Sequence, residues 1–296
     1  MKRSSYLFVF VVCLVCLVGY LNRDEFVTRE LHMYGNAYRV LPDAFLHTDI
    51  TADSFLVFDV QNGKELGERN PTTLHEMASV VKLLTADTAL SSSTIDASTT
   101  ISWRAVATSG KAGRLAYGEE YRVRELVFPL LLESSNDAAE AIAEVGGRSS
   151  FIKAMNARAR DIGMASTTVV DPSGLDRANA STARDLKVLL HHLFHTHRHV
   201  LDITSLRSYV GKEHVWQNND PVFSSEGFVG GKHGYTDTAG RTIALVYETT
   251  FGPGDVPRAV GVVLLDTDDI RGDVAKVQAE VARAVEVKPR IPNKLP

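Results

Sequence analysis

The stretch HEMASVVKLLTA, residues 75–86, is the part of the sequence from which the fold is inferred. It sets Ser79 and Lys82 in an S-x-x-K pattern at the start of an apolar run, which predicts a helix from Ser79 to about Leu90. Positions i and i+3 lie on one face of a helix, so the hydroxyl and the amine are expected within hydrogen-bond reach. A serine becomes a nucleophile when a neighbouring base takes its proton, and Lys82 is the base that this spacing offers.

A lysine needs help before it can act as that base. The free amine has a pKa of about 10.4 and is protonated at neutral pH. Burial and a neighbouring cation both lower the pKa of a lysine. A catalytic Lys82 therefore requires a buried site and a second cation from elsewhere in the chain. Without them, S-x-x-K is a chance spacing on an exposed helix.

Two later motifs supply candidates for these helpers. Ser134-Ser135-Asn136 stands at a break between two predicted helices, and Gly231-Lys232-His233-Gly234 stands at the start of a predicted strand. Taken singly, the first motif is best interpreted as a helix N-cap and the second as a solvated turn lysine. Taken together and in this order, S-x-x-K, S-x-N and K-x-G match the motif set of penicillin-binding proteins and class A β-lactamases.

With these motifs the chain resembles the low-molecular-mass penicillin-binding proteins, which are the serine D-alanyl-D-alanine carboxypeptidases of peptidase family S11. The likeness extends to DPSGLD at 171–176, STARDL at 181–186 and YTDTAGR at 235–241, and it covers roughly residues 50–285. It implies the α/β fold of the serine β-lactamases and penicillin-binding transpeptidases, with an antiparallel sheet built from both chain ends and a helical region. It implies no cofactor.

The resemblance also implies a role for each motif residue. Ser79 would attack the carbonyl between the two D-alanines of a peptidoglycan stem peptide, and Lys82 would accept its proton. Ser134 would pass a proton toward the leaving D-alanine, and Asn136 would orient Lys82 and the substrate amide. Lys232 would be the cation that keeps Lys82 neutral. Substrate-binding positions are implied for Lys232, His233, Gly234 and Tyr235, and the backbone N–H groups of Ser79 and Tyr235 would form the oxyanion hole.

His233 departs from the family pattern, which has Thr or Ser between the lysine and the glycine. The hydroxyl of that residue binds the terminal carboxylate of the substrate in the family. A histidine also donates a hydrogen bond, and it adds a positive charge when protonated. We therefore expect His233 to alter substrate preference and penicillin sensitivity more than catalysis, and to leave open a pH-dependent affinity.

Composition and the N-terminus suggest where the protein works. The 296 residues carry a net charge of −4, which argues against a nucleic-acid partner, and 44% are hydrophobic. Residues 6–21 form an uncharged apolar run after Lys2 and Arg3, the plan of a secretory signal or a membrane anchor. An uncleaved anchor is the favoured interpretation, with the rest of the chain outside the cytoplasm. Both cysteines, Cys13 and Cys16, lie in this run.

The rest of the chain is predicted to form one catalytic unit at 50–287, between a tether at 22–49 and a tail at 288–296. A β-hairpin is expected at 54–68 and a short strand or extended segment at 99–107. Helices are expected at 123–133, 138–145, 149–162, 182–194 (with Ser181 as its cap) and 273–285, and strands at 227–231, 235–249 and 259–266. This order favours one sheet from both chain ends with helices packed against it.

Other residues have less specific patterns. His191 and His195 share a helix face in the histidine-rich run 191–199, but the sequence places no acidic third ligand beside them, so no metal is predicted. Turn or cap roles are predicted for Asp137, Asp171 and Asp237, and packing roles for Trp103 and Trp216, with the cleft wall as the alternative for Trp216.

The expected function is a carboxypeptidase acting on stem peptides that end in D-Ala-D-Ala, with β-lactams as acylating inhibitors and the cell membrane bound through the N-terminal segment. The first alternative is an endopeptidase that cuts cross-links, because the brief chain end after residue 287 resembles endopeptidase-like members. The second is a β-lactamase, which needs a deacylation base that the sequence does not place between Asn136 and Lys232. The last is a catalytically silent peptidoglycan-binding protein, suggested by His233.

Overall fold

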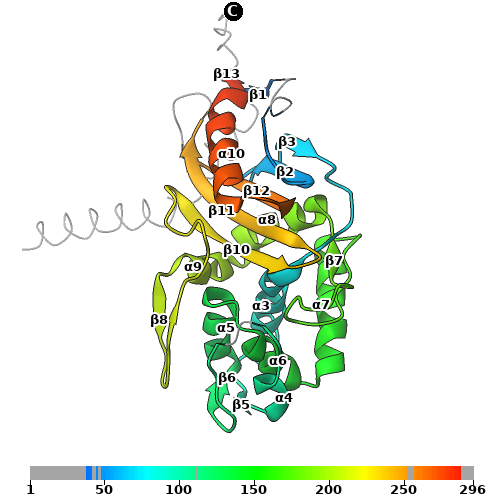
Figure 1. Ribbon diagram of the computed structural model, residues 1–296, viewed down its shortest axis with the longest axis vertical. Coiled ribbons are helices and arrows are strands. Elements are labelled where there is room, and N and C mark those ends of the chain that lie inside the picture. The colour runs from blue at the N-terminus through cyan, green and yellow to red at the C-terminus, as the bar shows by residue number, and fades with distance from the viewer. Residues whose placement is uncertain (1–37, 42–44, 46–47, 111–112, 252–256, 288–296) are drawn as a thin grey trace, which may run out of the picture.

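A five-stranded antiparallel sheet supports the rest of the fold (Figure 1), with the strand order β10-β11-β12-β2-β3. The first part of the chain provides β2 (Ser54–Asp59) and β3 (Glu65–Arg69), and the last part provides β10 (Phe228–Thr236), β11 (Gly240–Thr250) and β12 (Pro257–Thr267). β2 pairs directly with β12, so the two chain ends meet in the middle of the sheet. The predicted antiparallel sheet from both chain ends is confirmed.

The computed structural model describes residues 38–41, 45, 48–110, 113–251 and 257–287. The predicted signal or anchor at 1–21, residues 22–37 of the tether and the tail at 288–296 lie outside the described residues. Within the described ranges, no helix combines the length and the apolar character needed to cross a membrane.

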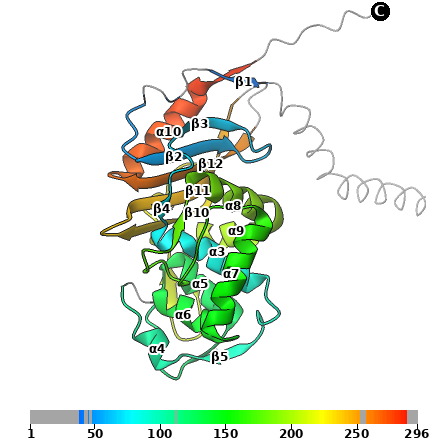
Figure 2. The same cartoon turned by 90° about the vertical axis from the view of Figure 1, so that its right-hand side faces the viewer.

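Helices cover both faces of the sheet, as Figures 1 and 2 show from two sides. Helix α10 (Ile270–Ala284) packs on one face, where its apolar side chains join one core cluster with β11, β12 and β2. The helical region packs on the other face and forms a second core cluster. It contains α3 (Lys82–Leu90), α4 (Trp103–Val106), α5 (Val123–Leu132), α6 (Asn136–Glu144), α7 (Arg148–Ile162), α8 (Ala183–Thr196) and α9 (Arg198–Ser205).

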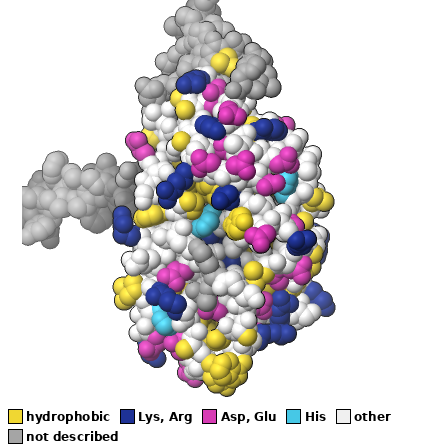
Figure 3. All heavy atoms as spheres, viewed as in Figure 1, with side chains coloured by type: hydrophobic (Ala, Val, Ile, Leu, Met, Phe, Trp, Pro, Cys, Tyr) yellow, Lys and Arg dark blue, Asp and Glu magenta, His cyan; other side chains and the backbone are white. Residues whose placement is uncertain are grey.

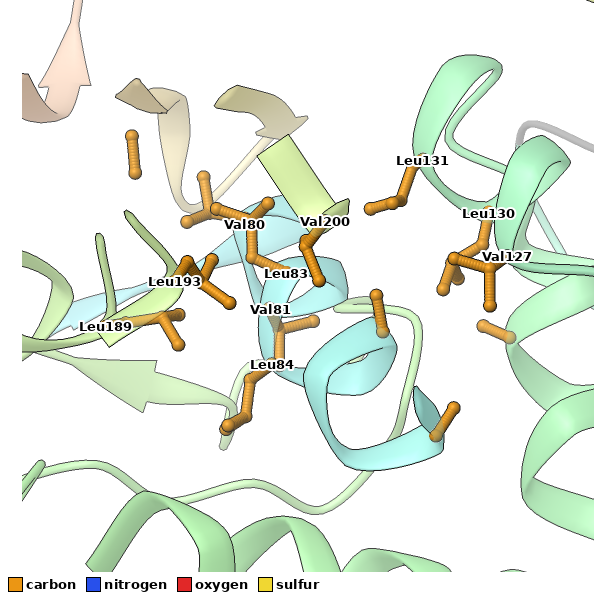
Figure 4. Close-up of a cluster of buried hydrophobic side chains, with 14 of the residues drawn as sticks. Val80, Val81, Leu83, Leu84, Val127, Leu130, Leu131, Leu189, Leu193 and Val200 are labelled. Atoms are coloured by element: carbon orange, nitrogen blue, oxygen red, sulfur yellow. The ribbon is translucent and has the colours of Figure 1, made fainter. Parts of the chain in front are cut away.

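Helix α3 runs through the second core cluster, with every residue from Lys82 to Ala89 buried. Figure 4 shows Val80, Val81, Leu83 and Leu84 among aliphatic side chains of α5, α8 and α9. A helix that is buried on all sides is held by packing rather than by its own propensity. The start of α3 is therefore a rigid place for chemistry, because neighbouring helices and the sheet fix it.

Four pairs of short strands complete the structure: β1 (Tyr38–Val40) with β13 (Val285–Val287), β4 (His75–Glu76) with β7 (Ala180–Ser181), β5 (Ser98–Thr100) with β6 (Glu120–Arg122), and β8 (Ser208–Val210) with β9 (Val215–Gln217). β1 shows that the folded domain begins before residue 50. Tyr38 is buried, and its hydroxyl donates to Asp59 over 2.7 Å. This part of the predicted tether is thus an integral strand.

Several predicted boundaries were wrong at the local level. Ser79 lies in a short 3₁₀ helix, η1 (Ala78–Val81), and the α-helix begins only at Lys82. Residues 103–106 of the predicted extended segment form α4, because Ser102 accepts a hydrogen bond from Ala105 N over 3.0 Å and caps it. The cap of α8 is Thr182 rather than Ser181, with Asp185 N as its donor.

The largest shift concerns the last strands. The K-x-G motif lies inside β10, and the turn to β11 falls at residues 237–239, near the start of the segment 235–249 that was predicted as one continuous strand. The alternation of side chains between the two faces of a strand does not reveal this turn, because it is present in the strands before and after the turn. Helix α9 and the β8–β9 hairpin were not predicted.

A buried ionic cluster ties α3 to α7, α8 and α9. Asp87 is fully buried and accepts a hydrogen bond from Arg158 Nε over 2.7 Å, and its other oxygen lies 2.5 Å from His197 Nδ1. Arg158 Nη2 also donates to His192 Nε2 over 2.9 Å. Burial alone would raise the pKa of Asp87, but the interactions with the His192 and Arg158 side chains, including the positive charge of Arg158, outweigh it and lower that pKa to about 2.

The same cluster bears on the histidine-rich run. Asp87, His192 and His197 place ligand atoms within 4.8 Å of one another and are the metal-capable group within the described ranges. It is not the His191–His195 pair considered from the sequence, since His195 Nε2 lies 2.9 Å from Val60 O instead. The Arg158 guanidinium lies among the three side chains and supplies the positive charge there.

An Asp87→Asn substitution is expected to lower the free energy of unfolding by about 3–5 kcal/mol, because it leaves a partly buried Arg158 without its counter-charge. The folded pKa of Asp87 lies below the unfolded value of about 3.9, so its contribution is complete above roughly pH 4 and is lost as pH falls through 2. Urea unfolding of both proteins between pH 7 and pH 2.5 measures this, and the gap between them should narrow below pH 4.

The matched control is Asp202→Asn, which removes an exposed carboxylate paired with Arg198 one helical turn away. Its expected cost is about 0.5 kcal/mol or less. An Asp87→Asn protein that is no less stable than the control would contradict the role given to the cluster.

Candidate active site

Ser79 and Lys82 are adjacent in space, as their spacing predicts. Lys82 Nζ lies 2.8 Å from Ser79 Oγ. The same amine lies 2.7 Å from Asn136 Oδ1 at the start of α6 and 2.5 Å from the backbone oxygen of Ser173. Three separate parts of the chain therefore converge on one nitrogen.

The geometry around Lys82 suits a neutral amine. A neutral amine has two N–H bonds and one lone pair, whereas an ammonium has three N–H bonds and none. The oxygens of Asn136 and Ser173 accept both N–H bonds, which leaves the lone pair for the Ser79 hydroxyl. In that state Ser79 donates to Lys82 and is ready to lose its proton.

The electrostatics favour the same state. Lys82 is fully buried, and this burial lowers the pKa of the amine well below its usual range. The charge of Lys232 lowers that pKa further, against the opposing charges of Asp171 and Asp137. Lys232 is itself buried in β10, where its Nζ donates to the backbone oxygen of His233 over 2.8 Å. Both requirements derived from the sequence, burial and a second cation, are present.

Ser134 and Asn136 lie at the junction of α5 and α6. The φ angle of Ser134 is 61°, in the left-handed region that costs a non-glycine residue of the order of 1 kcal/mol or more. Between them, Ser135 caps α6 by accepting from Ala138 N over 2.9 Å. The capping interpretation thus holds for Ser135, while Ser134 and Asn136 line the same cavity as Ser79.

The loop that presents Ser173 is built around Asp171, which the sequence suggested only as a turn residue. Asp171 accepts backbone hydrogen bonds from Ser173 over 2.6 Å, from Gly174 over 2.8 Å and from Asp176 over 2.7 Å. Burial opposes ionisation, but these hydrogen bonds lower the pKa of Asp171 overall. The turn role is confirmed, and it has a consequence for the site because the loop aims the Ser173 carbonyl at Lys82.

Strand β10 forms the opposite wall of the site. It is an edge strand of the sheet, so only one of its long edges is paired. Gly234 allows β10 to approach Ser79 closely, because a Cβ placed there would lie 2.5 Å from Ser79 N and 2.9 Å from Ala78 Cβ. Tyr235 follows with an exposed side chain that lines the cavity.

His233 is held by a residue that the sequence did not single out. Its Nδ1 lies 3.3 Å from Asp220 Oδ2, on the segment before β10. Burial would raise the pKa of Asp220, but the hydrogen bond and charge of His233 and the charge of Lys232 lower it. Asp220 therefore stays ionised beside the His233 ring. No sequence signal marks Asp220, because the contact comes from a loop.

The cavity has a volume of about 280 Å³. Its described walls contain Ser79, Ser134 and Asn136 and the segment 233–235 of β10, together with Gly110, Gly174, Leu175 and Thr236. No Asp or Glu side chain is among these described wall residues. All eight residues predicted for the site are placed at or beside this cavity, with Lys82 and Lys232 buried behind it.

The remaining candidates are more ordinary. Asp137 accepts a hydrogen bond from Gly113 N over 2.7 Å. Asp237, in the turn after β10, accepts one from the Tyr235 hydroxyl over 3.1 Å. Trp216 is fully buried, as its packing role predicts, and donates to Gly113 O over 3.0 Å. Trp103 is not a core residue, since it is 67% exposed and stacks on Tyr117 with 4.4 Å between ring centres.

Comparison with known proteins gives consistent results. The family model described as D-alanyl-D-alanine carboxypeptidase, Peptidase S11, matches residues 42–266. A D-alanyl-D-alanine endopeptidase of Pseudomonas aeruginosa is 38% identical over 154 residues, 49% of this chain and 48% of that protein. The carboxypeptidase DacB2 of Mycobacterium tuberculosis is 32% identical over 66% of this chain and 69% of its own length. The chain thus spans about half the length of the Pseudomonas relative.

Solved structures agree. A D-alanyl-D-alanine carboxypeptidase of Mycobacterium tuberculosis superposes with a TM-score of 0.70 at 28% identity, covering 82% of this chain and 94% of that one. Penicillin-binding protein D2 of Listeria monocytogenes, in its cefotaxime-bound form, gives 0.69 at 28% identity over 79% of this chain and 98% of that one. These structures confirm the expected fold. From its motifs, its fold and the match of well over half its length, the chain belongs to the S11 family of D-alanyl-D-alanine carboxypeptidases.

Proposed function

We propose that this chain is a serine-type D-alanyl-D-alanine carboxypeptidase that shortens peptidoglycan stem peptides through an acyl-serine intermediate. The observation that carries the proposal is the buried Lys82 amine, which has acceptors for both its N–H bonds and its lone pair toward Ser79. Such a pair activates a hydroxyl at neutral pH without a histidine.

In the proposed reaction, the side chains take the roles that the family resemblance implies. Ser79 Oγ attacks the carbonyl of the penultimate D-alanine while its proton passes to Lys82. The oxyanion is held by the backbone N–H groups of Ser79 and Tyr235, and Ser134 passes the proton to the departing amine. Asn136 orients Lys82 and the substrate amide. Water then attacks the acyl-enzyme and releases the shortened peptide, which restores Ser79.

A second candidate function is supported by the names of three relatives, from Pseudomonas aeruginosa, Escherichia coli and Haemophilus influenzae. The Pseudomonas relative, which is 38% identical over the matched part, is named an endopeptidase. The same acyl-serine chemistry would then cut a cross-link instead of removing a terminal D-alanine. A β-lactamase is less well supported, because fast deacylation needs a base that activates water, and the described cavity walls hold no carboxylate for it.

The proposed setting is outside the cytoplasm, where peptidoglycan is exposed, with residues 1–21 as an anchor or signal and 50–287 as the main part of the catalytic domain. β-Lactams are the proposed inhibitors, in line with the cefotaxime-bound and ampicillin-bound forms of the Listeria protein. The catalytically silent alternative would require His233 to prevent acylation at Ser79.

The direct test is acylation of the full-length chain, in detergent, by a reporter-labelled penicillin. A stable adduct of one drug molecule is expected on Ser79, located by peptide mass spectrometry and absent from Ser79→Ala. Release of D-alanine from a stem pentapeptide is then measured with both proteins. Fast turnover of the drug would indicate a β-lactamase, and neither adduct nor D-alanine release would leave only the binding function.

A further inference from the structure

His233 is a wall residue of the catalytic cavity and of a second hollow beside it. The cavity of about 280 Å³ has Ser79 and His233 in its walls, and the adjoining hollow has a volume of about 430 Å³. Gly234, the next residue of β10, lies so close to Ser79 that a Cβ there would be 2.5 Å from Ser79 N. Figure 3 shows basic, acidic and histidine side chains close together on the sheet side of this face. A titratable ring therefore lines the space in which the acyl-enzyme would form.

The ring of His233 is oriented by Asp220. Its Nδ1 lies 3.3 Å from Asp220 Oδ2, and that carboxylate is buried. Val222 N donates to the other oxygen of Asp220 over 3.0 Å, which fixes the carboxylate. An ionised carboxylate only accepts hydrogen bonds, so the proton between the two groups lies on Nδ1. Nε2 is then the ring nitrogen through which His233 meets a ligand or water.

The place beside His233 changes its occupant during the proposed reaction. Residue 233 binds the terminal carboxylate of the substrate in the family, and a ring with a proton on Nε2 suits that anion. The departing D-alanine takes this carboxylate with it when the acyl-enzyme forms, and water fills the place. A Thr or Ser hydroxyl is too weak a base to take a proton from this water, whereas a neutral imidazole is suited to it near pH 7.

We propose that His233, positioned by Asp220, is the general base that activates water for hydrolysis of the acyl-enzyme. This inference rests on the proposed acyl-serine function. Lys82 remains the base of the first half of the reaction, and the ring acts only in the second half. Asp220 is a positioning residue, because its carboxylate holds the tautomer that has a lone pair on Nε2.

The bond changes are those of an ester hydrolysis. The ring gives its Nε2 proton to solvent once the carboxylate has left, and takes one up again when the next carboxylate binds. In between, water gives its hydroxyl to the acyl carbon and its proton to Nε2. The ester bond to Ser79 Oγ then breaks, and the proton on Nε2 ends on Ser79 Oγ. This restores the serine hydroxyl and the neutral ring.

The same arrangement gives peptides and penicillins different fates. A β-lactam opens its ring on acylation, so no part of the drug departs and its carboxylate stays attached to the adduct. That carboxylate continues to occupy His233, and water cannot take its place. The peptide acyl-enzyme is thus expected to be hydrolysed quickly, while the penicillin adduct on Ser79 persists.

The charges around the ring bear on the pH dependence of this step. Charged groups face it from the segment before β10, from β10 itself and across the adjoining hollow: Asp220, Lys232, Arg241, Asp268, Asp269 and Arg271. A histidine changes its charge between about pH 5 and pH 8. Hydrolysis needs the neutral ring, so its rate should fall as the pH falls through this range.

The test measures the first turnover separately from later ones, with the full-length enzyme in detergent and a stem pentapeptide. His233→Thr introduces the family residue, which keeps a ligand for the carboxylate. The steady rate of D-alanine release should fall about 10²-fold or more, as for the loss of a general base. D-Alanine leaves on acylation, so a rapid burst of one molecule per enzyme should precede the slow phase, with acyl-enzyme accumulating on Ser79. Acylation by penicillin should stay close to the wild-type rate.

Asp220→Asn tests the positioning role in a second protein. Val222 N holds the oxygen of the new amide, so its N–H group faces Nδ1 and favours the tautomer without a lone pair on Nε2. The same burst is expected, and both variants should lose the rise of the hydrolysis rate between about pH 5 and pH 8. The matched control is Asp237→Asn, which removes an exposed carboxylate paired with the Tyr235 hydroxyl and should behave as the wild type.

The outcomes separate this inference from the proposed function. A His233→Thr protein without a burst and with an unchanged steady rate would overturn the inference. A higher KM with an unchanged kcat would also overturn it, because the ring would then only bind the carboxylate. A burst in Asp237→Asn would do the same, since loss of charge near the site would be the cause. A wild type that neither forms a penicillin adduct nor releases D-alanine would overturn the proposed function itself.

Discussion

A Lys82→Met variant is expected to be acylated by penicillin about 10³–10⁴ times more slowly than the wild type, the upper part of the range for losing a general base. Methionine has a similar length and remains apolar, so it suits a fully buried position. The amine proposed to accept the Ser79 proton is then gone, and among the described residues no other base is hydrogen-bonded to Ser79 Oγ. The measurement is the rate of adduct formation on a time course with labelled penicillin.

The same variant carries a stability cost that must be controlled. Asn136 Oδ1 and Ser173 O each lose a donor, at about 1–3 kcal/mol for a buried acceptor. A thermal unfolding curve therefore accompanies every rate, and only variants folded at the assay temperature are compared. A folded Lys82→Met protein that acylates at nearly the wild-type rate would refute the role of the amine.

The pH dependence tests the charge state directly. In the proposed mechanism acylation requires neutral Lys82, and burial together with Lys232 lowers the pKa of that amine. The wild-type rate should thus rise with pH and level off well below 10.4, the ordinary value for lysine. A Lys232→Gln variant removes the neighbouring positive charge, which raises the pKa of Lys82, so the rise should move to higher pH. A rise that stays in place would show that Lys232 does not act through charge.

Much of the candidate site was predictable because its parts are short local patterns. The i, i+3 spacing of Ser79 and Lys82 holds even though the first turn is 3₁₀ and not α, since both helices bring these positions to one side. Lys232 was predicted as the helper cation only through the family resemblance. Nothing in its local sequence distinguishes it from an exposed turn lysine, and only its burial in β10 does so.

The parts that were missed depend on backbone atoms and loops. The Ser173 carbonyl completes the surroundings of Lys82, yet a backbone oxygen has no residue signature. Asp220 reaches His233 from a loop 13 positions away, a contact set by the path of the chain and not by a period. Long strands such as β12 were predicted from apolar runs, whereas the three-residue strands β8 and β9 are too short to show alternation.

A Gly234→Ala substitution is expected to slow acylation about 10²- to 10³-fold, the usual cost of losing one oxyanion donor. The added Cβ would lie 2.5 Å from Ser79 N, closer than nonbonded atoms tolerate, so β10 must move away from the nucleophile. Such a shift separates the N–H groups of Ser79 and Tyr235, which in the proposed mechanism bind one oxygen together. We expect this movement of β10 to lower the acylation rate more than the free energy of unfolding, because β10 is an edge strand with only one paired side.

The matched control is Gly146→Ala, where the new methyl group would meet nothing within 4 Å. Both variants add one methyl group to a glycine with no positive φ recorded, so they differ chiefly in the contact with Ser79. If the effect acts through the oxyanion hole, Gly234→Ala lowers the maximal acylation rate and leaves its pH dependence in place, because Lys82 and Lys232 are untouched. A shift of the pH profile would instead mean that moving β10 changes the pKa of Lys82. The strand would then affect acylation mainly by displacing Lys232.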